Sequence, residues 1–347
     1  MTAALPPREA VTRLLVWHRG ALGDLLLAGP ALAAVCRHYS RARLVGVGHP
    51  ERWRLLSGTL PLDEVWNGDE ADWAWLFQEA APLPRTLRGR LAPFDLALVF
   101  TPRLPPMLLA RLKEGGIGAV HWIPSFPQGG AEGVAACQAR HLEGLGLPLE
   151  VAPFRLILPG NPEEDEIPEL PGLGPWMAVA PGSGHPLKNW PLSHYYTLTR
   201  DLTWQHGLRM AWLAGPAEAR LLPFLKGLAG ASGHVVLANL SLPRVAAAIS
   251  RCCLYVGGDS GLTHLAAALG VPVLALFGPT DPRVWAPQGK RVRVLTGPCP
   301  EAPCARGREI SCDAPRCLAD LAPEQVRAAA ATLVSPRTAA VKNFGSG

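Results

Sequence analysis

Short apolar runs alternate with helix-like stretches along the whole chain. In the first half, the pattern predicts strands at 14–17, 43–47 and 95–100 and a helix at 25–35. In the second half, it predicts strands at 177–180, 209–214, 254–256 and 271–277 and helices at 262–269 and 323–333, with Gly270 ending the first of these helices. Strands that alternate with helices are typical of a doubly wound parallel sheet, so the predicted fold class is α/β.

Length and local composition indicate two domains. The chain has 347 residues, which is long for one hydrophobic core and suits two domains of ordinary size. Between 159 and 175 the composition changes to Pro, Gly and acidic residues, as in an interdomain linker. We therefore predict an N-terminal domain at 1–160, a linker at 161–175, a C-terminal domain at 176–335 and a disordered tail at 336–347.

Composition and charge narrow the class of protein. Hydrophobic residues make up 48% of the chain and charged residues 18%, which describes a globular protein with a large interior. The formal net charge is only +5, so nucleic acid is not an expected partner. No apolar segment is long enough for a transmembrane helix, and charged residues interrupt the N-terminus where a secretory signal would lie. A cytoplasmic protein is expected.

Two polar turns in the second half follow predicted strands and are candidates for a ligand site. They are 257–261 (Gly-Gly-Asp-Ser-Gly) and 278–282 (Gly-Pro-Thr-Asp-Pro). In open α/β sheets, ligands bind at the carboxyl ends of the strands. The first turn also leads into a helix, and the free backbone N–H groups at 260–263 would favour a diphosphate. The alternative is a buried crossover whose turn is merely polar.

Three charged side chains lie in other turns that follow predicted strands. Asp24 ends the loop 18–24 (His-Arg-Gly-Ala-Leu-Gly-Asp), and it is either a general base or only a residue favoured by the helix dipole. Lys188 follows the glycine turn 181–184 and suits a phosphate oxygen, although an exposed loop lysine is an equal alternative. Glu218 could accept hydrogen bonds from ribose hydroxyls or simply begin a helix.

Basic residues and cysteines leave two further questions open. Six basic residues between 85 and 113 form either a solvated face or a surface for a phosphorylated acceptor: Arg85, Arg88, Arg90, Arg103, Arg111 and Lys113. Four late cysteines lack the close pairs of a zinc ribbon: Cys299, Cys304, Cys312 and Cys317. We expect no metal there, but a surface loop with free thiols that can pair on oxidation.

Three motifs together resemble glycosyltransferase family 9, the ADP-heptose:lipopolysaccharide heptosyltransferases. The first is 20–24 (Gly-Ala-Leu-Gly-Asp) followed by Pro30, and the second is 181–184 (Pro-Gly-Ser-Gly) with 188–191 (Lys-Asn-Trp-Pro). The third and most specific is 258–265 (Gly-Asp-Ser-Gly-Leu-Thr-His-Leu) followed by 277–282. The resemblance covers nearly the whole chain.

This resemblance implies a GT-B architecture, in which two Rossmann-like doubly wound domains face a central cleft. It implies an inverting enzyme without a metal or other cofactor. The implied reaction moves heptose, or a related sugar, from ADP-heptose or a similar nucleotide sugar to a lipid A core oligosaccharide in lipopolysaccharide biosynthesis. The enzyme would be a cytoplasmic monomer with at most a peripheral contact with the inner membrane.

Residue roles follow from the resemblance by motif position. Asp24 corresponds to the catalytic base. The implied donor-binding residues are Ser183, Lys188, Glu218, Asp259, Ser260, Gly261, Leu262, Thr263 and His264. The acceptor-side candidates are His18, Arg19 and Gly23. The chain departs from the family at His18, where many members carry an arginine.

Two other functions stay open from sequence. A nucleotide-sugar epimerase of the same fold accounts for the nucleotide site but not for the loop that holds Asp24. A non-catalytic sugar-nucleotide-binding protein would need neither Asp24 nor Lys188. The sequence fixes neither the acceptor sugar, nor the nucleotide sugar, nor the role of the late cysteines, nor the oligomeric state.

Overall fold

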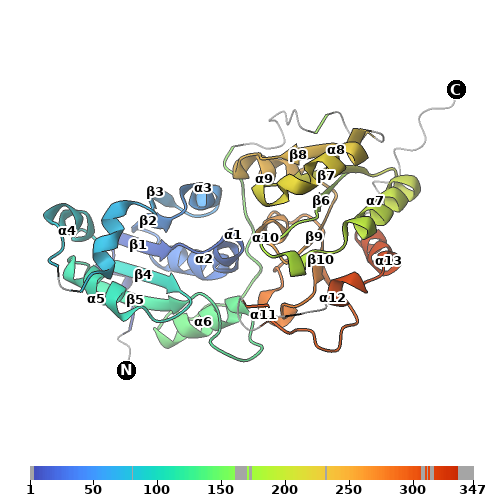
Figure 1. Ribbon diagram of the computed structural model, residues 1–347. Helices are drawn as coiled ribbons and strands as arrows, with labels where there is room; N and C mark the ends of the chain where they lie inside the picture. Colours follow the sequence, from blue (N-terminus) through green and yellow to red (C-terminus); the bar gives the residue numbers. More distant parts are fainter. Residues whose placement is uncertain are drawn as a thin grey trace. The chain divides into compact units, whose positions relative to one another are not determined.

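The chain forms two compact α/β units. The computed structural model describes residues 4–79, 81–160, 170–171, 174–230, 233–305, 309–310, 312 and 316–334. The units are Met1–Pro159 and Gly160–Gly347, and each has its own parallel sheet (Figure 1). The predicted linker at 161–175 lies largely outside the described residues, and the predicted tail at 336–347 lies wholly outside them.

The first unit is built on a five-stranded parallel sheet with the order β3-β2-β1-β4-β5. Its strands are β1 (Arg13–His18), β2 (Arg43–Gly48), β3 (Leu62–Asn67), β4 (Leu96–Thr101) and β5 (Ala119–Pro124). Its helices are α1 (Leu22–Leu27), α2 (Gly29–His38), α3 (Pro50–Arg54), α4 (Arg85–Leu91), α5 (Pro106–Glu114) and α6 (Val134–Gly144), with a 3-10 stretch η3 (Ala71–Phe77).

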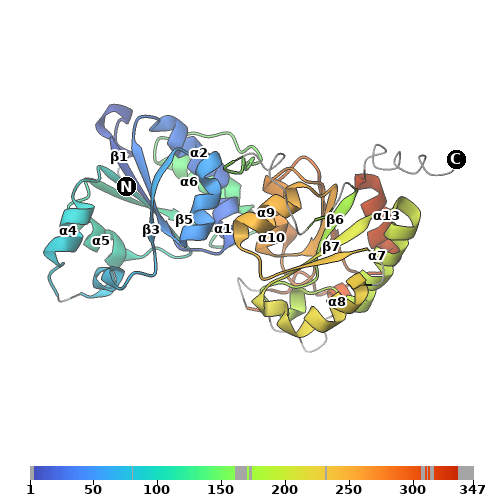
Figure 2. The ribbon, with the colours of Figure 1, turned by 90° about the horizontal axis from the view of Figure 1, so that it is seen from above.

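Strand β1 lies at the centre of this sheet and is covered on both faces. Every residue from Leu14 to His18 is buried, as expected for a central parallel strand. Leu15 and Trp17 belong to a core that also includes residues of α4 and α5. On the opposite face, α2 packs beside α6 (Figure 2). The apolar run at the start of the chain therefore forms the centre of the first unit.

The second unit is built on a six-stranded parallel sheet with the order β11-β10-β9-β6-β7-β8. Its strands are β6 (Trp176–Ala180), β7 (Arg209–Ala214), β8 (Val235–Ala238), β9 (Leu254–Gly258), β10 (Val273–Phe277) and β11 (Val292–Thr296). Its helices are α7 (Leu192–His206), α8 (Leu222–Gly230), α9 (Leu242–Ser250), α10 (Gly261–Ala268), α11 (Pro282–Trp285), α12 (Arg316–Ala319) and α13 (Pro323–Leu333).

Helices cover both faces of the second sheet (Figure 2). Helices α7 and α13 pack together on one face, where their apolar residues join Met177 and Val256 in a single core. Helices α9 and α10 pack together on the other face. Gly270 follows the end of α10 with a φ of +76°, a left-handed conformation that glycine adopts without strain. The predicted glycine stop is therefore confirmed.

The prediction of one helix at 25–35 is wrong. The chain forms two helices there, α1 and α2, which are separated at Ala28. Pro30 has no backbone N–H, so it cannot continue the hydrogen-bond ladder of α1 but is accepted in the first turn of α2. The predicted fold class, two Rossmann-like α/β units, is confirmed.

One strand of the first unit differs from the expectation. The edge strand β3 was not predicted, because half of its residues are polar and none is buried. Within the described parts of the chain, no helix combines the length and apolar character that a bilayer crossing requires.

Asp95 joins the starts of β1 and β4, and its removal tests how the first sheet is held. Its Oδ2 accepts hydrogen bonds from the Thr12 N–H (2.7 Å), the Thr12 hydroxyl (2.8 Å) and the Arg13 N–H (2.9 Å). Burial alone would raise the pKa of Asp95, but these hydrogen bonds outweigh burial and lower it.

We predict that Asp95→Asn lowers the free energy of unfolding by about 1–3 kcal/mol at pH 7. A lowered carboxyl pKa stabilises the fold above its ordinary value near 4, so the difference from wild type should shrink as the pH falls below that value. Urea titrations between pH 3 and pH 7 measure this. Asp72→Asn, at an exposed position of η3, is the control. An equal loss in both variants would contradict the assignment.

Candidate functional site

The candidate ligand site lies at the carboxyl edge of the second sheet. Strands β10, β9, β6 and β7 are direct neighbours and run parallel, so the turns that follow them meet at one edge. These turns carry most of the predicted donor-binding residues. Parallel pairing thus brings together positions that are far apart in the sequence.

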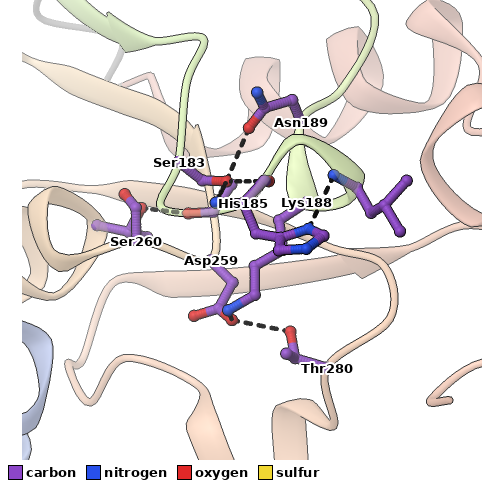
Figure 3. A network of polar contacts seen from close by, with 10 residues as sticks. Ser183, His185, Lys188, Asn189, Asp259, Ser260 and Thr280 are labelled. Atoms are coloured by element: carbon purple, nitrogen blue, oxygen red, sulfur yellow. Dashed lines mark hydrogen bonds and ion pairs between the residues drawn. The ribbon is translucent and has the colours of Figure 1, made fainter. Parts of the chain in front are cut away.

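A carboxylate links three of these turns. Lys188 Nζ lies 2.7 Å from Asp259 Oδ2, and the Thr280 hydroxyl donates to the same oxygen at 2.9 Å (Figure 3). The side chains of Lys188 and Asp259 are 23% and 11% exposed, so the pair is partly desolvated but open to solvent on one side. Thr280 was quoted in a motif from the sequence but was not predicted as a site residue.

Two glycines allow these turns to approach one another. A side chain at Gly258 would place its Cβ 2.7 Å from the carbonyl oxygen of Lys188. A side chain at Gly182 would place its Cβ 1.9 Å from Oε1 of Glu218. Both distances are shorter than real contacts. At Gly258 the neighbour is backbone, so glycine is required there, whereas at Gly182 the end of the Glu218 side chain would have to move.

The Lys188 turn is braced by its own polar side chains (Figure 3). Ser183 Oγ lies 2.7 Å from Asn189 Oδ1 and 2.8 Å from the His185 carbonyl oxygen. The Leu187 N–H donates to His185 Nδ1 at 3.2 Å. Ser183 therefore lies in the predicted site, where its visible contacts hold the shape of the turn.

The first turn of α10 presents open backbone at the same edge. Residues 259–262 are half-buried, whereas Thr263 and His264 are buried. The Thr263 hydroxyl contacts the Gly258 carbonyl, Ser260 Oγ (3.1 Å) and the Tyr255 hydroxyl (3.2 Å). Gly261 and Leu262 can therefore offer N–H groups to an anion, while Thr263 supports them from beneath.

Glu218 lies beside this group at the end of β7. Its Oε2 accepts a hydrogen bond from the Gly215 N–H at 2.8 Å, which caps the 3-10 turn that follows β7. Its charge also acts on the buried Tyr255, whose pKa burial raises to about 12. Tyr255 was not predicted from sequence, because a buried tyrosine in a strand has no distinctive pattern.

The acceptor-side candidates and Asp24 lie in the first unit, in the loop between β1 and α1. Asp24 Oδ2 accepts a hydrogen bond from the Ala21 N–H at 3.1 Å, so the carboxylate caps α1. His18 and Gly23 are buried. Arg19 turns away to pair with Asp69 at 2.9 Å. Arg52, which was not predicted, donates to the Gly20 carbonyl at 3.0 Å and fixes the loop.

The late cysteines do not form the simple surface loop that the sequence suggested. All eight cysteines carry free thiols. Cys317 is buried against the turn that follows β10, where a side chain at Gly278 would lie 2.9 Å from its Sγ. Burial, followed by the nearby thiols of the three other late cysteines, raises the pKa of Cys317. Among the described residues, no group of three or more His, Cys, Asp or Glu side chains could hold a metal ion.

Sequence comparisons connect this geometry to known proteins. Residues 145–312 match the model of glycosyltransferase family 9 (heptosyltransferase). Lipopolysaccharide heptosyltransferase 1 of Pseudomonas aeruginosa is 30% identical over 147 residues, which are 42% of this chain and 40% of that protein. The enzyme of the same name from Salmonella typhimurium is 37% identical over 114 residues, 32% of this chain and 34% of that protein. The matched part of the chain, nearly half of its length, is therefore similar to glycosyltransferase family 9.

The sequence matches to these family 9 proteins are partial, whereas the shared fold is complete. The matched segments span only 40% and 34% of the two curated relatives. The glycosyl transferase family 9 structure from Veillonella parvula superposes with a TM-score of 0.74 at 17% identity, over 96% of this chain and 99% of that chain. E. coli heptosyltransferase WaaC with ADP gives 0.67 at 19% identity, over 92% and 99%. Both structures share the fold of this chain, in agreement with the predicted pair of Rossmann-like α/β units.

The Thr263 hydroxyl offers a test of what holds α10 against β9. We predict that Thr263→Val, which keeps the shape of the side chain, lowers the free energy of unfolding by about 1–3 kcal/mol, because it leaves the Gly258 carbonyl without this donor. Urea denaturation measures the loss. The matched control is Thr197→Val on the exposed face of α7, where the hydroxyl bonds only its own helix. Equal stability of the two variants would show that the Thr263 contacts contribute nothing.

Proposed function

We propose that this chain is an inverting glycosyltransferase that moves heptose, or a related sugar, from an ADP-sugar donor to a lipopolysaccharide core acceptor. The observation that carries the proposal is the pairing of Lys188 with Asp259 beside the open first turn of α10. A lysine and a helix N-terminus together attract a diphosphate, and the carboxylate can accept hydrogen bonds from sugar hydroxyls.

The donor would replace contacts that the protein makes with itself. Without a ligand, Asp259 offsets the charge of Lys188 at 2.7 Å. A diphosphate oxygen would compete for Lys188 and free one side of Asp259 for the sugar, while Thr280 keeps the carboxylate oriented. As the glycosidic bond to ADP breaks, negative charge gathers on the leaving diphosphate, and Lys188 and the N–H groups of Gly261 and Leu262 would stabilise it.

Other predicted residues have supporting roles in this proposal. Glu218 would accept hydrogen bonds from the ribose hydroxyls, because it lies on the turn after β7 beside the diphosphate turn. Ser183 and Ser260 would line the donor, and Thr263 and His264 would support α10 from its buried side.

Asp24 would act as the general base. Inversion requires an acceptor hydroxyl to attack the anomeric carbon while a base takes its proton. Asp24 is half-buried in the first turn of α1, with its carboxylate oriented by the Ala21 N–H. His18, Arg19 and Gly23 share this loop and form the acceptor side. Because Arg19 pairs with Asp69, it would have to leave that ion pair to reach an acceptor.

Names of similar proteins support the substrate class. The curated relatives are lipopolysaccharide heptosyltransferases, and E. coli WaaC has been solved with ADP and with ADP-2-deoxy-2-fluoro heptose. We propose the same donor and acceptor classes here, and a monomer that works in the cytoplasm with at most a peripheral contact with the inner membrane. We further propose that transfer needs no metal or other cofactor, since Lys188 and α10 supply the positive field.

One assay separates this proposal from its rivals. The purified protein is dialysed against a chelator and incubated with ADP-heptose, with and without a truncated lipid A core acceptor. We expect ADP release that depends on the acceptor and persists after chelation. Isomerised donor without ADP would indicate an epimerase, and donor binding without any turnover would indicate a binding protein. Loss of activity on chelation, restored by a metal, would overturn the cofactor proposal alone.

We predict that Asp24→Asn lowers turnover by about two to four orders of magnitude, the usual contribution of a general base. The amide oxygen can still cap α1, so the melting temperature and the affinity for ADP should stay close to those of wild type. Asp72→Asn, at an exposed position in the same unit, should keep wild-type turnover. Normal turnover in Asp24→Asn would remove Asp24 from catalysis.

We predict that Lys188→Ala weakens ADP binding and slows transfer together, because its charge acts on the diphosphate in both the ground state and the transition state. Calorimetry at low and high salt should show a smaller salt dependence of the affinity in this variant. Lys226→Ala, an exposed lysine of α8, is the matched control. If both variants bind ADP as wild type does, Lys188 is only a structural partner of Asp259.

A further inference from the structure

His18 is a buried histidine at the end of the central strand β1, and its ring makes no hydrogen bond. Its side chain is 2% exposed, and neither ring nitrogen has a hydrogen-bond partner. The backbone at this position is fixed, because the Trp53 indole N–H donates to the His18 carbonyl at 3.3 Å. Buried polar groups rarely stay unpaired, so the ring of His18 should gain a partner in another state of the protein.

The imidazole edge of His18 adjoins the carboxylate of Asp24. A Cβ built at Gly20 would lie 2.8 Å from His18 Cε1 and 3.1 Å from Asp24 Oδ2, so the two side chains border the same space beside Gly20. Cε1 is the ring carbon between Nδ1 and Nε2, and both nitrogens therefore flank the edge that faces this point.

Burial keeps this imidazole neutral. Desolvation lowers the pKa of His18 to about 4, although the charge of Asp24 opposes that shift. The charged groups that act on the ring are Asp24 on α1 and Arg52 on α3. From β4, the neighbour is the Phe100 ring, with ring centroids 5.7 Å apart. A neutral imidazole carries one N–H donor and one acceptor nitrogen.

We propose that His18 is a positioning residue for Asp24: in the reacting state its ring N–H donates to the Asp24 carboxylate and fixes it to accept the proton of the acceptor hydroxyl. This inference rests on the proposed function, in which Asp24 is the base.

Neutrality of His18 matters for the strength of that base. A hydrogen bond from a neutral N–H orients the carboxylate with little loss of basicity. A cation at the same position would stabilise the charged carboxylate and make it a weaker base. The proton taken by Asp24 stays on its carboxyl group until it is released to solvent, so no further group is needed to balance the step.

The test is the pH dependence of kcat in variants of His18. In wild type, kcat should fall along the acidic limb of the profile as the catalytic base becomes protonated. His18→Gln keeps a neutral N–H donor and should leave the limb in place with kcat within about tenfold of wild type. His18→Leu removes the donor and should lower kcat by about 10- to 100-fold with little change in the KM of the donor sugar. His18→Lys should move the limb to lower pH by about one unit or more.

His121→Lys is the matched control, because His121 is also buried but lies on β5. It is expected to lower stability without moving the limb. An unchanged limb in His18→Lys, or wild-type kcat in His18→Leu, would overturn the role of His18 while leaving Asp24 as the base. Wild-type activity in Asp24→Asn would instead overturn the proposed function.

A second measurement does not depend on turnover or on the folding of the His18 variants. The ¹⁵N chemical shifts of the His18 ring should show a neutral imidazole at pH 6.5, and their pattern should change in Asp24→Asn. The proposal is contradicted if the ring is protonated at pH 6.5, or if its ¹⁵N chemical shifts are the same in Asp24→Asn as in wild type.

Discussion

The candidate donor site depends on the hydrogen bonds of the Asp259 carboxylate. One of its oxygens accepts hydrogen bonds from the ammonium of Lys188 and from the hydroxyl of Thr280, which links the turns that follow β6, β9 and β10. Parallel pairing of these strands brings the turns to one edge, and Gly258 lets the Lys188 turn approach closely enough. The polar side chains of the site are therefore held in place by one another, and a diphosphate would exchange one set of polar contacts for another.

In the first unit, polar contacts likewise hold the candidate residues in place, but they act on the backbone of a loop and not through an ion pair. Asp24 caps α1, Arg52 holds the Gly20 carbonyl, and Trp53 holds the His18 carbonyl. Each contact fixes backbone in a loop that sequence composition alone would leave flexible. A carboxylate that must accept a proton benefits from such support, because its orientation is set before an acceptor arrives.

Sequence patterns predicted the positions of turns better than the contacts between them. Gly270 correctly predicted the end of α10, and the apolar run that ends at Phe277 correctly predicted β10. The break at Pro30 was overlooked although proline cannot continue a helix. Strand β3 was missed because an exposed edge strand lacks the apolar run that marks a buried one.

Side-chain partners were beyond the reach of the sequence. Lys188 and Asp259 are 71 residues apart, and Thr280 is 21 residues from Asp259. Their meeting depends on strand order, which a single sequence does not fix. The burial of the His18 ring could not be predicted from the sequence either. A histidine beside a polar loop motif suggests an exposed side chain, whereas His18 is buried at the end of β1.

Hydrogen exchange in the presence of ADP tests the central claim most directly, namely that the carboxyl edge of the second sheet holds the diphosphate. Bound ADP should slow amide exchange in peptides that cover 182–188 and 258–263. The first unit provides an internal comparison, because it has a pocket of about 500 Å³ beside α2 that includes Arg37 and Arg155. Protection confined to peptides of that pocket, or no protection in 258–263 at saturating ADP, would contradict the account.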